Sequence, residues 1–451
     1  MLEQTLRHFR RYQEIVSVLI RNGLGFILFE HLGLGGNGAR SDKDLVQLGQ
    51  RVRRALGELG PTFIKIGQFV STRPDIIPKP VLRELEYLQD RAPLLRFEEV
   101  KHLVEQELGA PINRNFRIFD PSPLAAASIG QVHYAVLHSG EPVVVKVQRP
   151  NITALIQTDL EIMKDIVSLI EQRLPKAKEY ALPGLLQEFS GWLKKELDYM
   201  AEGKNAEKMA KGFESDPQVI IPRIFWEFTT RRVLTMAYVD GVKLNDRQQI
   251  AARHYDQKLI AARLSKALLQ QIIRDGFFHG DPHPGNIFVL SGARIAFVDF
   301  GIVGNLTPVM KHRFANLISA LARRNTKSMV KALLQLGVVS QNVDLARLTQ
   351  DLDRLRKKHL DVPIAQTVLP ELVNDLLTMA SQHRIEIPSD FILLGKSLLI
   401  LEGIVHELDP TLSVAELVKP FRLQFIRERF DIFSWLKKFA RRSPSAPDNQ
   451  A

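Results

Sequence analysis

Two short segments of this sequence carry the residue types that phosphoryl transfer requires. The first reads His279-Gly-Asp-Pro-His-Pro-Gly-Asn286, and the second, Asp299-Phe-Gly301, follows after a short hairpin pattern. Phosphoryl transfer needs a carboxylate close to the attacking oxygen, together with oxygen ligands that hold Mg²⁺ against the phosphates. The D-x-x-x-x-N spacing assigns the first role to Asp281 and predicts that Asn286 binds the metal, and the Asp-Phe-Gly segment predicts Asp299 as a further metal ligand.

A lysine on an upstream valine-rich segment extends this pattern. Lys146 lies within Val143-Val-Val-Lys-Val147, and a lysine on such a strand pairs with the α- and β-phosphates of ATP. A glutamate on a nearby helix would hold that lysine in place. Glu196 is the first candidate and Glu202 the second, since the two would lie about 120° apart around one helix. We predict Asp281, Lys146 and Glu196 as catalytic residues.

Each segment also has an ordinary structural interpretation. A single Asp-Phe-Gly is usually a turn, and a single lysine in a strand is usually an exposed edge residue. His279, Asp281 and His283 could form a metal-binding trio, but the prolines make this segment a loop without the helical H-x-x-x-H geometry. We therefore expect structural roles for the histidines. The order of lysine strand, acidic helix, D-x-x-x-x-N and Asp-Phe-Gly favours a kinase-like nucleotide site.

An alanine-rich stretch, Leu124-Ala-Ala-Ala-Ser128, stands where a kinase would carry its glycine-rich loop. Glycine allows a positive φ and close approach of the backbone to phosphate, whereas alanine disfavours both. We expect a stiffer loop, and we hypothesise that Ala126→Gly alters nucleotide affinity or selectivity. The alternative is that the alanines begin a buried helix. The predicted nucleotide-binding residues are Ala125, Ala126, Ala127, Ser128, Lys146, Met236 and Tyr238.

A second glycine pattern, Gly33-Leu-Gly-Gly-Asn-Gly38, matches G-x-G-x-x-G literally. A dinucleotide site would need a strand before this motif and a helix after it, within a βαβ unit. A helix-like segment precedes it, so we interpret the glycines as a flexible linker.

Composition limits the classes of protein that the chain can belong to. The 451 residues, 45% of them hydrophobic, can build a two-lobed enzyme, and the net charge of +11 favours anionic partners. No base-reading motif accompanies this charge, so we do not expect nucleic acid as a partner. The absence of cysteine excludes disulfides and thiolate metal sites.

No segment is apolar enough to predict a transmembrane helix. The most apolar run, from Phe391 to Val405, is interrupted by Lys396 and Glu402, which predicts a buried helix. The basic and apolar residues of the N-terminus interleave, unlike those of a signal peptide.

The patterns together predict an α+β, protein-kinase-like two-lobed fold with an N-terminal helical extension and a mostly helical C-terminal lobe. Predicted helices cover residues 151–174 and 184–212, and predicted strands cover 128–137, 141–148, 219–228, 232–238, 286–290 and 295–298. The predicted domains are an amphipathic N-terminal helix and linker (1–42), a helical extension with Lys-x-Gly-Gln (43–110), a kinase-like N-lobe (111–240), a helical C-lobe (241–418), and a basic amphipathic helix with a disordered tail (419–451).

These motifs give the sequence a resemblance to the UbiB family of atypical kinase-like proteins, which support ubiquinone (coenzyme Q) biosynthesis. The motifs that carry the resemblance are Lys65-Ile-Gly-Gln68, Ala125-Ala-Ala-Ser128, Ile129-Gly-Gln-Val-His133, Val145-Lys146, Glu196-Leu-Asp198, the segment from His279 to Asn286, and Asp299-Phe-Gly301. They occur in the family's order, and the helical segment that follows them is consistent with the family.

The resemblance implies that the Lys-x-Gly-Gln motif folds over the active site and fills the space of a protein substrate. It maps to Lys65, Gly67 and Gln68, which we predict as regulatory residues together with Asp198 and Glu202. The implied cofactors are ATP or ADP with Mg²⁺, with Mn²⁺ as an alternative. The implied activity is that of an atypical kinase or ATPase whose phosphate acceptor is water or the protein itself. The alternatives are a nucleotide-gated lipid-binding scaffold and a small-molecule kinase without protein kinase activity in trans.

The resemblance also implies a membrane partner. Many bacterial members end in paired hydrophobic helices, whereas residues 419–442 of this chain read as a basic, aromatic-rich amphipathic helix. Such a helix can lie in an anionic membrane interface or pack on the helical lobe. We therefore expect a cytoplasmic protein at the surface of the inner membrane. Its expected partners are anionic lipids and quinone-biosynthesis enzymes or hydrophobic quinone precursors, and a homodimer is a further expectation.

Overall fold

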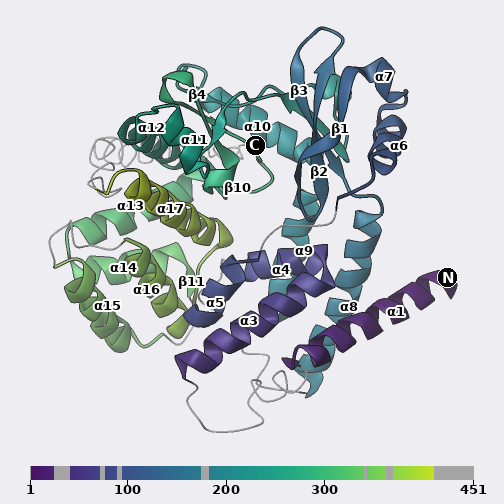
Figure 1. Ribbon diagram of the computed structural model, residues 1–451. Coiled ribbons are helices and arrows are strands. Elements are labelled where there is room, and N and C mark those ends of the chain that lie inside the picture. The colour runs from purple at the N-terminus through teal and green to yellow at the C-terminus, as the bar shows by residue number, and fades with distance from the viewer. Residues whose placement is uncertain are drawn as a thin grey trace, which may run out of the picture. The chain divides into compact units, whose positions relative to one another are not determined.

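The computed structural model of the chain describes residues 2–24, 41–71, 77–88, 94–173, 182–339, 343–361 and 369–410 (Figure 1). The residues group into two compact units. The first contains Met1–Ala210, Ile221–Asp240 and Asp299–Ile302, and the second contains Lys211–Ile220, Gly241–Val298 and Val303–Ala451. Both units combine helices with small sheets, which confirms the predicted α+β class. The predicted glycine linker and basic C-terminal helix lie outside the described residues.

A four-stranded antiparallel sheet organises the first unit. Its strands are β1 (Phe116–Ala126), β2 (Gly130–Leu137), β3 (Pro142–Gln148) and β5 (Val233–Ala237), in the order β1-β2-β3-β5. The odd-numbered valines of β3 are fully buried against the helix α6 (Phe97–Leu108). Because side chains alternate along a strand, Lys146 lies on the other face of the sheet. Figure 1 shows α6 and the short helix α7 (Ile112–Asn115) beside β1.

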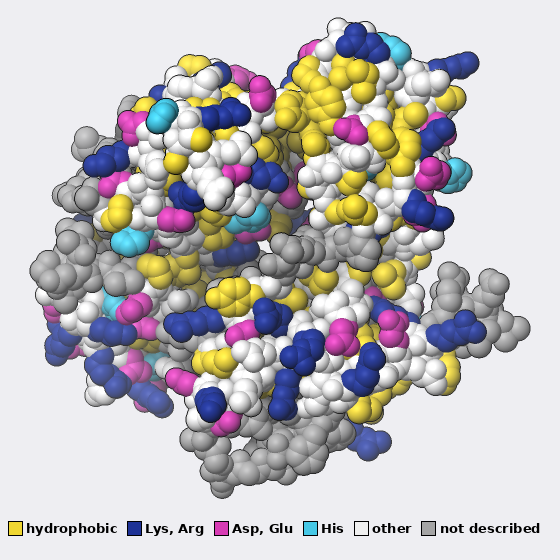
Figure 2. All heavy atoms as spheres, in the orientation of Figure 1, with side chains coloured by type: hydrophobic (Ala, Val, Ile, Leu, Met, Phe, Trp, Pro, Cys, Tyr) yellow, Lys and Arg dark blue, Asp and Glu magenta, His cyan; other side chains and the backbone are white. Residues whose placement is uncertain are grey.

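Helices form the rest of the first unit. They are α1 (Leu2–Arg21), α3 (Asp42–Leu59), α4 (Pro61–Ser71), α5 (Lys79–Glu86), α8 (Ile152–Arg173), α9 (Leu182–Glu196) and α10 (Tyr199–Gly212). An apolar core joins five of them, with Ile15 from α1, Ala55 from α3, Phe63 from α4, Ile156 from α8 and Phe189 from α9. Lysine and arginine side chains gather over α3 on the face shown in Figure 2.

A buried ion pair and its hydrogen bonds connect four of these helices, α1, α3, α4 and α8. The Arg11 guanidinium of α1 donates hydrogen bonds to both carboxylate oxygens of Asp159 on α8, at 2.7 and 3.1 Å. It also donates to the Leu59 carbonyl at 2.6 Å, and the Thr62 hydroxyl of α4 donates to Asp159. Asp159 has no exposed surface, so these donors satisfy a charge that water does not reach.

The second unit is mostly helical. Its helices are α11 (Arg247–Ala252), α12 (Gln257–Leu269), α13 (Pro308–Ala322), α14 (Thr326–Leu336), α15 (Leu345–His359), α16 (Leu369–Gln382) and α17 (Ser389–Leu408). A sheet of order β4-β9-β8-β6 is built from β4 (Val219–Ile220), β6 (Val242–Lys243), β8 (Ile287–Leu290) and β9 (Arg294–Phe297). Two-stranded sheets pair β7 (Phe277–His279) with β10 (Val303–Asn305) and β11 (Val338–Val339) with β12 (Ile385–Glu386).

The apolar run of α17 is a buried helix, as its interrupting charges predicted. Phe391, Leu394, Leu401 and Val405 are each at most 5% exposed. No helix in the described ranges is long and apolar enough to cross a membrane.

Two predictions of secondary structure were wrong. The helix predicted over 184–212 is two helices, because α9 ends at Glu196 and α10 begins at Tyr199. The strand predicted over 219–228 shortens to Val219–Ile220, followed by a 3₁₀ turn at Trp226–Phe228. The first strand, β1, was not predicted because its two prolines hide its extended pattern.

Candidate functional site

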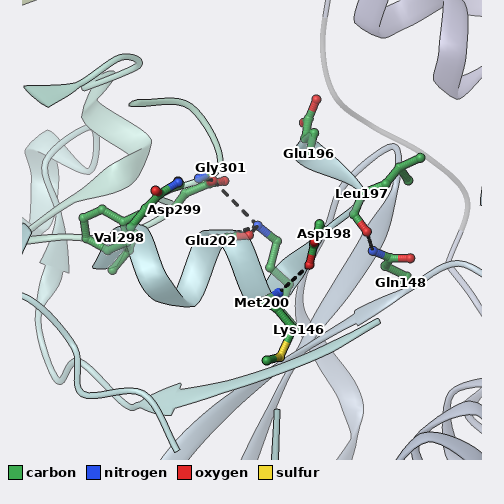
Figure 3. Close-up of polar contacts among 12 residues, drawn as sticks. Lys146, Gln148, Glu196, Leu197, Asp198, Met200, Glu202, Val298, Asp299 and Gly301 are labelled. Atoms are coloured by element: carbon green, nitrogen blue, oxygen red, sulfur yellow. Dashed lines mark hydrogen bonds and ion pairs between the residues drawn. The ribbon is translucent and has the colours of Figure 1, made fainter. Parts of the chain in front are cut away.

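Lys146 forms the centre of a charged cluster in the first unit. Its Nζ donates to both carboxylate oxygens of Glu202 on α10 at 2.9 Å, and it lies 3.7 Å from Oδ1 of Asp299 (Figure 3). The ammonium also lies 5.1 Å from the centre of the Tyr199 ring. Glu202 is 3% exposed, whereas about half of the Asp299 side chain is exposed, so the cluster opens on the Asp299 side.

The electrostatics of this cluster leave an excess of negative charge. Burial raises the pKa of Glu202 to about 7, and Asp299 adds to the effect while Lys146 opposes it. Burial alone would lower the pKa of Lys146, but the charges of Asp299 and Glu202 hold it well above its ordinary value. Lys146 therefore stays protonated beside Asp299 and Glu202, and as Glu202 ionises above about pH 7 their combined negative charge favours the arrival of another cation.

The predicted partner of Lys146 was wrong, because Glu202 and not Glu196 pairs with it. The prediction placed both glutamates on one helix, but Leu197 and Asp198 interrupt it. Asp198 Oδ1 accepts hydrogen bonds from the amides of Met200 and Ala201, at 3.1 and 3.4 Å, as an N-cap residue does. Figure 3 shows Glu196 away from Lys146, beyond this cap.

Glu196 instead pairs with Lys65 of the Lys-x-Gly-Gln segment. Lys65 lies on α4 and its residue is 6% exposed. Phe69 fixes this helix against α9, since its ring lies 5.5 Å from Phe189 and 6.0 Å from Trp192.

Gly67 permits close packing in the same helix. A Cβ at this position would lie 2.2 Å from Cδ1 of Leu88 and 2.9 Å from Cδ1 of Leu56. Gln68, the last residue of the motif, is half-buried, and its carbonyl accepts a hydrogen bond from the Ser71 hydroxyl at 2.8 Å. The motif is therefore an integral part of the helical core of the first unit.

The alanine-rich stretch closes a tight β1–β2 hairpin, so the alternative of a buried helix is wrong. Ala125 and Ala126 pair with Val132 and Gln131, and the Ala127 amide donates to the Gly130 carbonyl at 2.8 Å. The Arg149 guanidinium donates two hydrogen bonds to the Ala127 carbonyl, at 3.1 and 3.3 Å. None of the alanines has a positive φ. The hairpin is thus held by the ladder and by Arg149, without the freedom of glycine.

The close contacts of Gly130, at the start of β2, explain why this position is a glycine. A Cβ there would lie 2.6 Å from the Val147 carbonyl and 2.6 Å from the Tyr199 hydroxyl. Tyr199 itself is fully buried at the start of α10. The hairpin and the helix that carries Glu202 therefore meet at this glycine.

The strand register brings several predicted nucleotide-binding residues to one face of the sheet. Val132 pairs with both Ala125 and Lys146, and Lys146 pairs with Leu234, so these side chains share a face. Met236, two residues beyond Leu234, lies on that face and is 6% exposed. The predicted residues that fall elsewhere are Ala126, which pairs on the opposite face, Ala127 and Ser128 in the turn, and Tyr238, which packs against Tyr134 beyond the strand end.

The Asp-Phe-Gly segment is held by α10. Asn205 Nδ2 donates to the Phe300 carbonyl at 2.9 Å, one helical turn after Glu202. Asp299 has φ of 64°, a left-handed conformation that aspartate adopts more readily than most residues. Its Oδ1 accepts from the Gly301 amide at 3.3 Å. Asn205 was not predicted, although its place three residues after Glu202 puts it on the same side of α10.

In the second unit, Asp281 pairs with a lysine that the sequence did not assign to the site. Lys396 Nζ of α17 lies 2.9 Å from Asp281 Oδ1. Burial would raise the pKa of Asp281, but Lys396 and His283 hold it below its ordinary value, so the carboxylate is charged at neutral pH. The feature of the sequence that could have indicated a role for Lys396 is its position as a charged residue within an apolar run.

The loop around Asp281 uses its histidines as structural supports. His279 Nδ1 accepts from the Asp281 amide at 3.1 Å, so Nε2 carries the proton that it shares with the Val298 carbonyl at 3.1 Å. His283 Nδ1 accepts from the Gly285 amide at 2.9 Å. A Cβ at Gly285 would lie 2.6 Å from the His283 ring, which explains this glycine. The arrangement agrees with the structural roles expected for these histidines.

The predicted metal ligands have the right chemistry for Mg²⁺. Asn286 Nδ2 donates to the Asp281 carbonyl at 3.2 Å, which leaves its Oδ1 as an available acceptor. Asp299 offers a half-exposed carboxylate. In the part of the chain that the structure describes, no group of three or more His, Asp or Glu side chains could hold a metal ion. Mg²⁺ commonly binds to one or two protein oxygens and completes its shell with phosphates and water, so the chemistry of each donor, taken by itself, suits the ion.

The buried lysine–glutamate pair beside Asp-Phe-Gly, and the Asp281–Asn286 loop, define a kinase-like protein. Comparisons with known proteins agree with this class. The family model of the ABC1 atypical kinase-like domain matches residues 87–333, and that of the UbiB helical domain matches residues 352–413. The chain therefore belongs to the UbiB family of ABC1 atypical kinase-like proteins.

Individual relatives support this assignment. The "Probable protein kinase UbiB" of Xanthomonas campestris is 34% identical, over 89% of this chain and 74% of its own. An uncharacterised protein of Synechocystis is 35% identical over 83% of this chain, but the chain spans only 64% of that relative. The solved structure of Rv3197 with erythromycin, from Mycobacterium tuberculosis, has a TM-score of 0.56 at 25% identity and covers 84% of this chain and 95% of its own.

Proposed function

We propose that this protein is an atypical kinase-like ATPase that binds ATP or ADP with Mg²⁺ and supports isoprenoid quinone biosynthesis at a membrane surface. The observation that carries the proposal is the Lys146 cluster, in which one ammonium faces two carboxylates. Lys146 would bind the α- and β-phosphates, and the metal would neutralise the remaining charge. The bound Mg²⁺ would supply electrostatic stabilisation of the transferring phosphoryl group.

The other residues have separate roles in this proposal. Asp299 and Asn286 would supply oxygen ligands to the metal, and Asp281 would accept the proton of the attacking oxygen. Glu202 would hold Lys146 extended, since it bonds the ammonium with both of its oxygens. The acceptor of the phosphoryl group is proposed to be water or the protein itself.

The first experiment measures ATP hydrolysis and binding of a fluorescent adenine nucleotide as Mg²⁺ is titrated. We expect Asp299→Asn to reduce hydrolysis at least about 100-fold, because an amide replaces a charged metal ligand. Asp165→Asn is the matched control, since Asp165 is an exposed aspartate of α8 in the same unit. Equal activity of wild type and Asp299→Asn would contradict the proposal.

The quinone role is supported by the UbiB relative and by the family assignment. Its test adds anionic vesicles and a soluble phenolic mimic of a quinone precursor to the hydrolysis assay. Stimulation that needs both Asp299 and the vesicles supports an ATPase at a membrane surface. Vesicle binding that depends on nucleotide, without hydrolysis, would instead favour a nucleotide-gated lipid-binding scaffold.

A further inference from the structure

The segment between Asp299 and Asp344 has a single sign of charge. Residues 300–343 contain no aspartate or glutamate, although 50 acidic residues in 451 correspond to about five in a segment of this length. The segment carries six lysines and arginines, all of them in α13, α14 or the connection between these helices. The α13–α14 hairpin is therefore a local source of the positive charge of the chain.

A groove of about 380 Å³ lies between these two helices. The polar residues that line it are His312, Asn316, Ser319, Arg323, Ser328, Lys331 and Gln335. They recur at intervals of three or four residues along α13 and its C-cap and along α14, so one face of each helix lines the groove. Ala320 and Ala332 also line it and are 4% and 3% exposed, so small buried side chains form its floor.

Two basic side chains of the groove, Arg323 and Lys331, are exposed. In the described part of the chain, neither forms an ion pair. The carboxylate of Asp353 approaches the hairpin, where it accepts a hydrogen bond from the Thr326 hydroxyl at 3.1 Å. Asp353 already pairs with Arg356 and Lys357 on its own helix, so its charge is balanced there.

We propose that the α13–α14 groove binds a phosphate-bearing anion. Arginine can donate to two phosphate oxygens at once, lysine adds a point charge, and the neighbouring amides and hydroxyls complete the hydrogen bonding. The volume is at the lower end of the range of small-molecule sites, which suits a phosphate monoester. That ester is either a free metabolite or the headgroup of a lipid. The groove lies wholly in the second unit, so it is a site additional to the Lys146 cluster.

A charge-matched pair of double variants tests this site in the full chain. Arg323→Glu/Lys331→Glu reverses the two cations of the lining, and Arg324→Glu/Lys327→Glu makes the same change of net charge on the same hairpin outside the lining. One arm measures binding of glycerol 3-phosphate by calorimetry. The other arm measures co-flotation with phosphatidylcholine vesicles, with and without phosphatidic acid.

We expect the lining variant to lose at least about tenfold in affinity, which corresponds to about 1.4 kcal/mol, because it removes the charged hydrogen bonds of both cations. The control should stay within about twofold of the wild type, since it retains both lining cations. Binding in the calorimetric arm identifies a free phosphate ester, and binding only to phosphatidic acid vesicles identifies a lipid headgroup.

Three results would overturn the proposal. One is that wild type binds in neither arm. Another is an equal loss of affinity in both double variants, which indicates that the net charge of the hairpin, and not the groove, attracts the anion. The third is that Lys146→Met loses binding of the phosphate ester while the lining variant keeps it, which places the phosphate in the nucleotide site. Thermal unfolding identifies any variant that fails to fold, and Arg323→Gln/Lys331→Gln then replaces the charge reversal.

Discussion

Among the described residues of the first unit are two buried lysine–glutamate pairs, Lys65–Glu196 and Lys146–Glu202, whose glutamates are six residues apart in the chain. Lys65 is on a helix packed into an apolar core, and Glu196 is the last residue of a second helix. Lys146 is on a strand, and Glu202 is in the first turn of α10. Because the helix is interrupted at Asp198, the two carboxylates point in different directions and pair with different lysines.

The surroundings of the two pairs differ in charge and access. At Lys146 a second carboxylate, Asp299, lies within 3.7 Å and is half-exposed. At Lys65, packing of Phe69 and Gly67 holds the helix in place. A buried ion pair alone is weak evidence for either stability or function. The additional accessible carboxylate is what makes the Lys146 pair suited to a ligand, whereas the Lys65 pair joins two helices.

The largest expected effect separates the two lysines. We expect Lys146→Met to weaken binding of Mg²⁺–nucleotide at least about 100-fold, because methionine cannot make the charged hydrogen bonds that the ammonium would make to the phosphates. Lys65→Met should keep nucleotide affinity within about threefold but change ATP hydrolysis or autophosphorylation, as a regulatory residue would. Titration with a fluorescent nucleotide, beside a hydrolysis assay, measures both. Equal losses of affinity would remove the distinction between the pairs.

Substitution of the two glutamates should affect nucleotide affinity differently, as for the two lysines, but by a smaller factor. We expect Glu202→Gln to weaken nucleotide binding about tenfold, because the amide no longer accepts two bonds from a charged Lys146. Glu196→Gln should leave nucleotide affinity within about twofold. The same titration compares the two isosteric changes. A reversed order would restore Glu196 as the partner of Lys146 and contradict the observed pairing.

Glu202 should also give the stability of the protein a pH dependence. Its folded pKa of about 7 is above the ordinary value of 4.5, so the folded state holds an extra proton between those values. The contribution of Glu202 to the free energy of unfolding is fully present below about pH 4.5 and is lost as the pH rises through 7. The slope is at most about 1.4 kcal/mol per pH unit. Chemical unfolding between pH 5 and 8 should show this slope in wild type and lose it in Glu202→Gln; an unchanged slope would refute the assignment.

The smallest effect concerns the residue that positions Asp299. Asn205→Ala removes the hydrogen bond to the Phe300 carbonyl, so we expect the Mg²⁺ concentration for half-maximal hydrolysis to rise about threefold to tenfold. Nucleotide affinity without metal should not change, because Lys146 and Glu202 keep their contacts. Asn205→Asp, which keeps the shape but not the donor, should behave like alanine. A loss of affinity without metal would indicate a general structural role instead.

The sequence predicts those parts of the site whose positions depend only on residue type and local spacing. The D-x-x-x-x-N and Asp-Phe-Gly spacings are local, and the alternating valines predict the face of Lys146. The prediction failed at Glu196 because a two-residue break in a continuous helical pattern changes the direction of every later side chain. The N-cap signal of Asp198 was present but was interpreted as part of a functional motif.

Residues that act across long separations could not be predicted. Lys396 reaches Asp281 from more than a hundred positions away, and Arg11 is similarly far from Asp159. Nothing in local periodicity relates such positions, since packing alone brings them together. What the sequence did show was the anomaly, a lysine within an apolar run.

The Arg11–Asp159 ion pair has a consequence for how the protein is produced and assayed. Thr62 shares the Asp159 carboxylate and stands three residues before Lys65 on α4. A shortened protein that lacks the first eleven residues would therefore leave a negative charge inside the helical bundle, next to the helix that carries Lys65. Purified fragments that begin after α1 should consequently differ from the full chain in the Lys65–Glu196 contact, even though every residue of the nucleotide site is present.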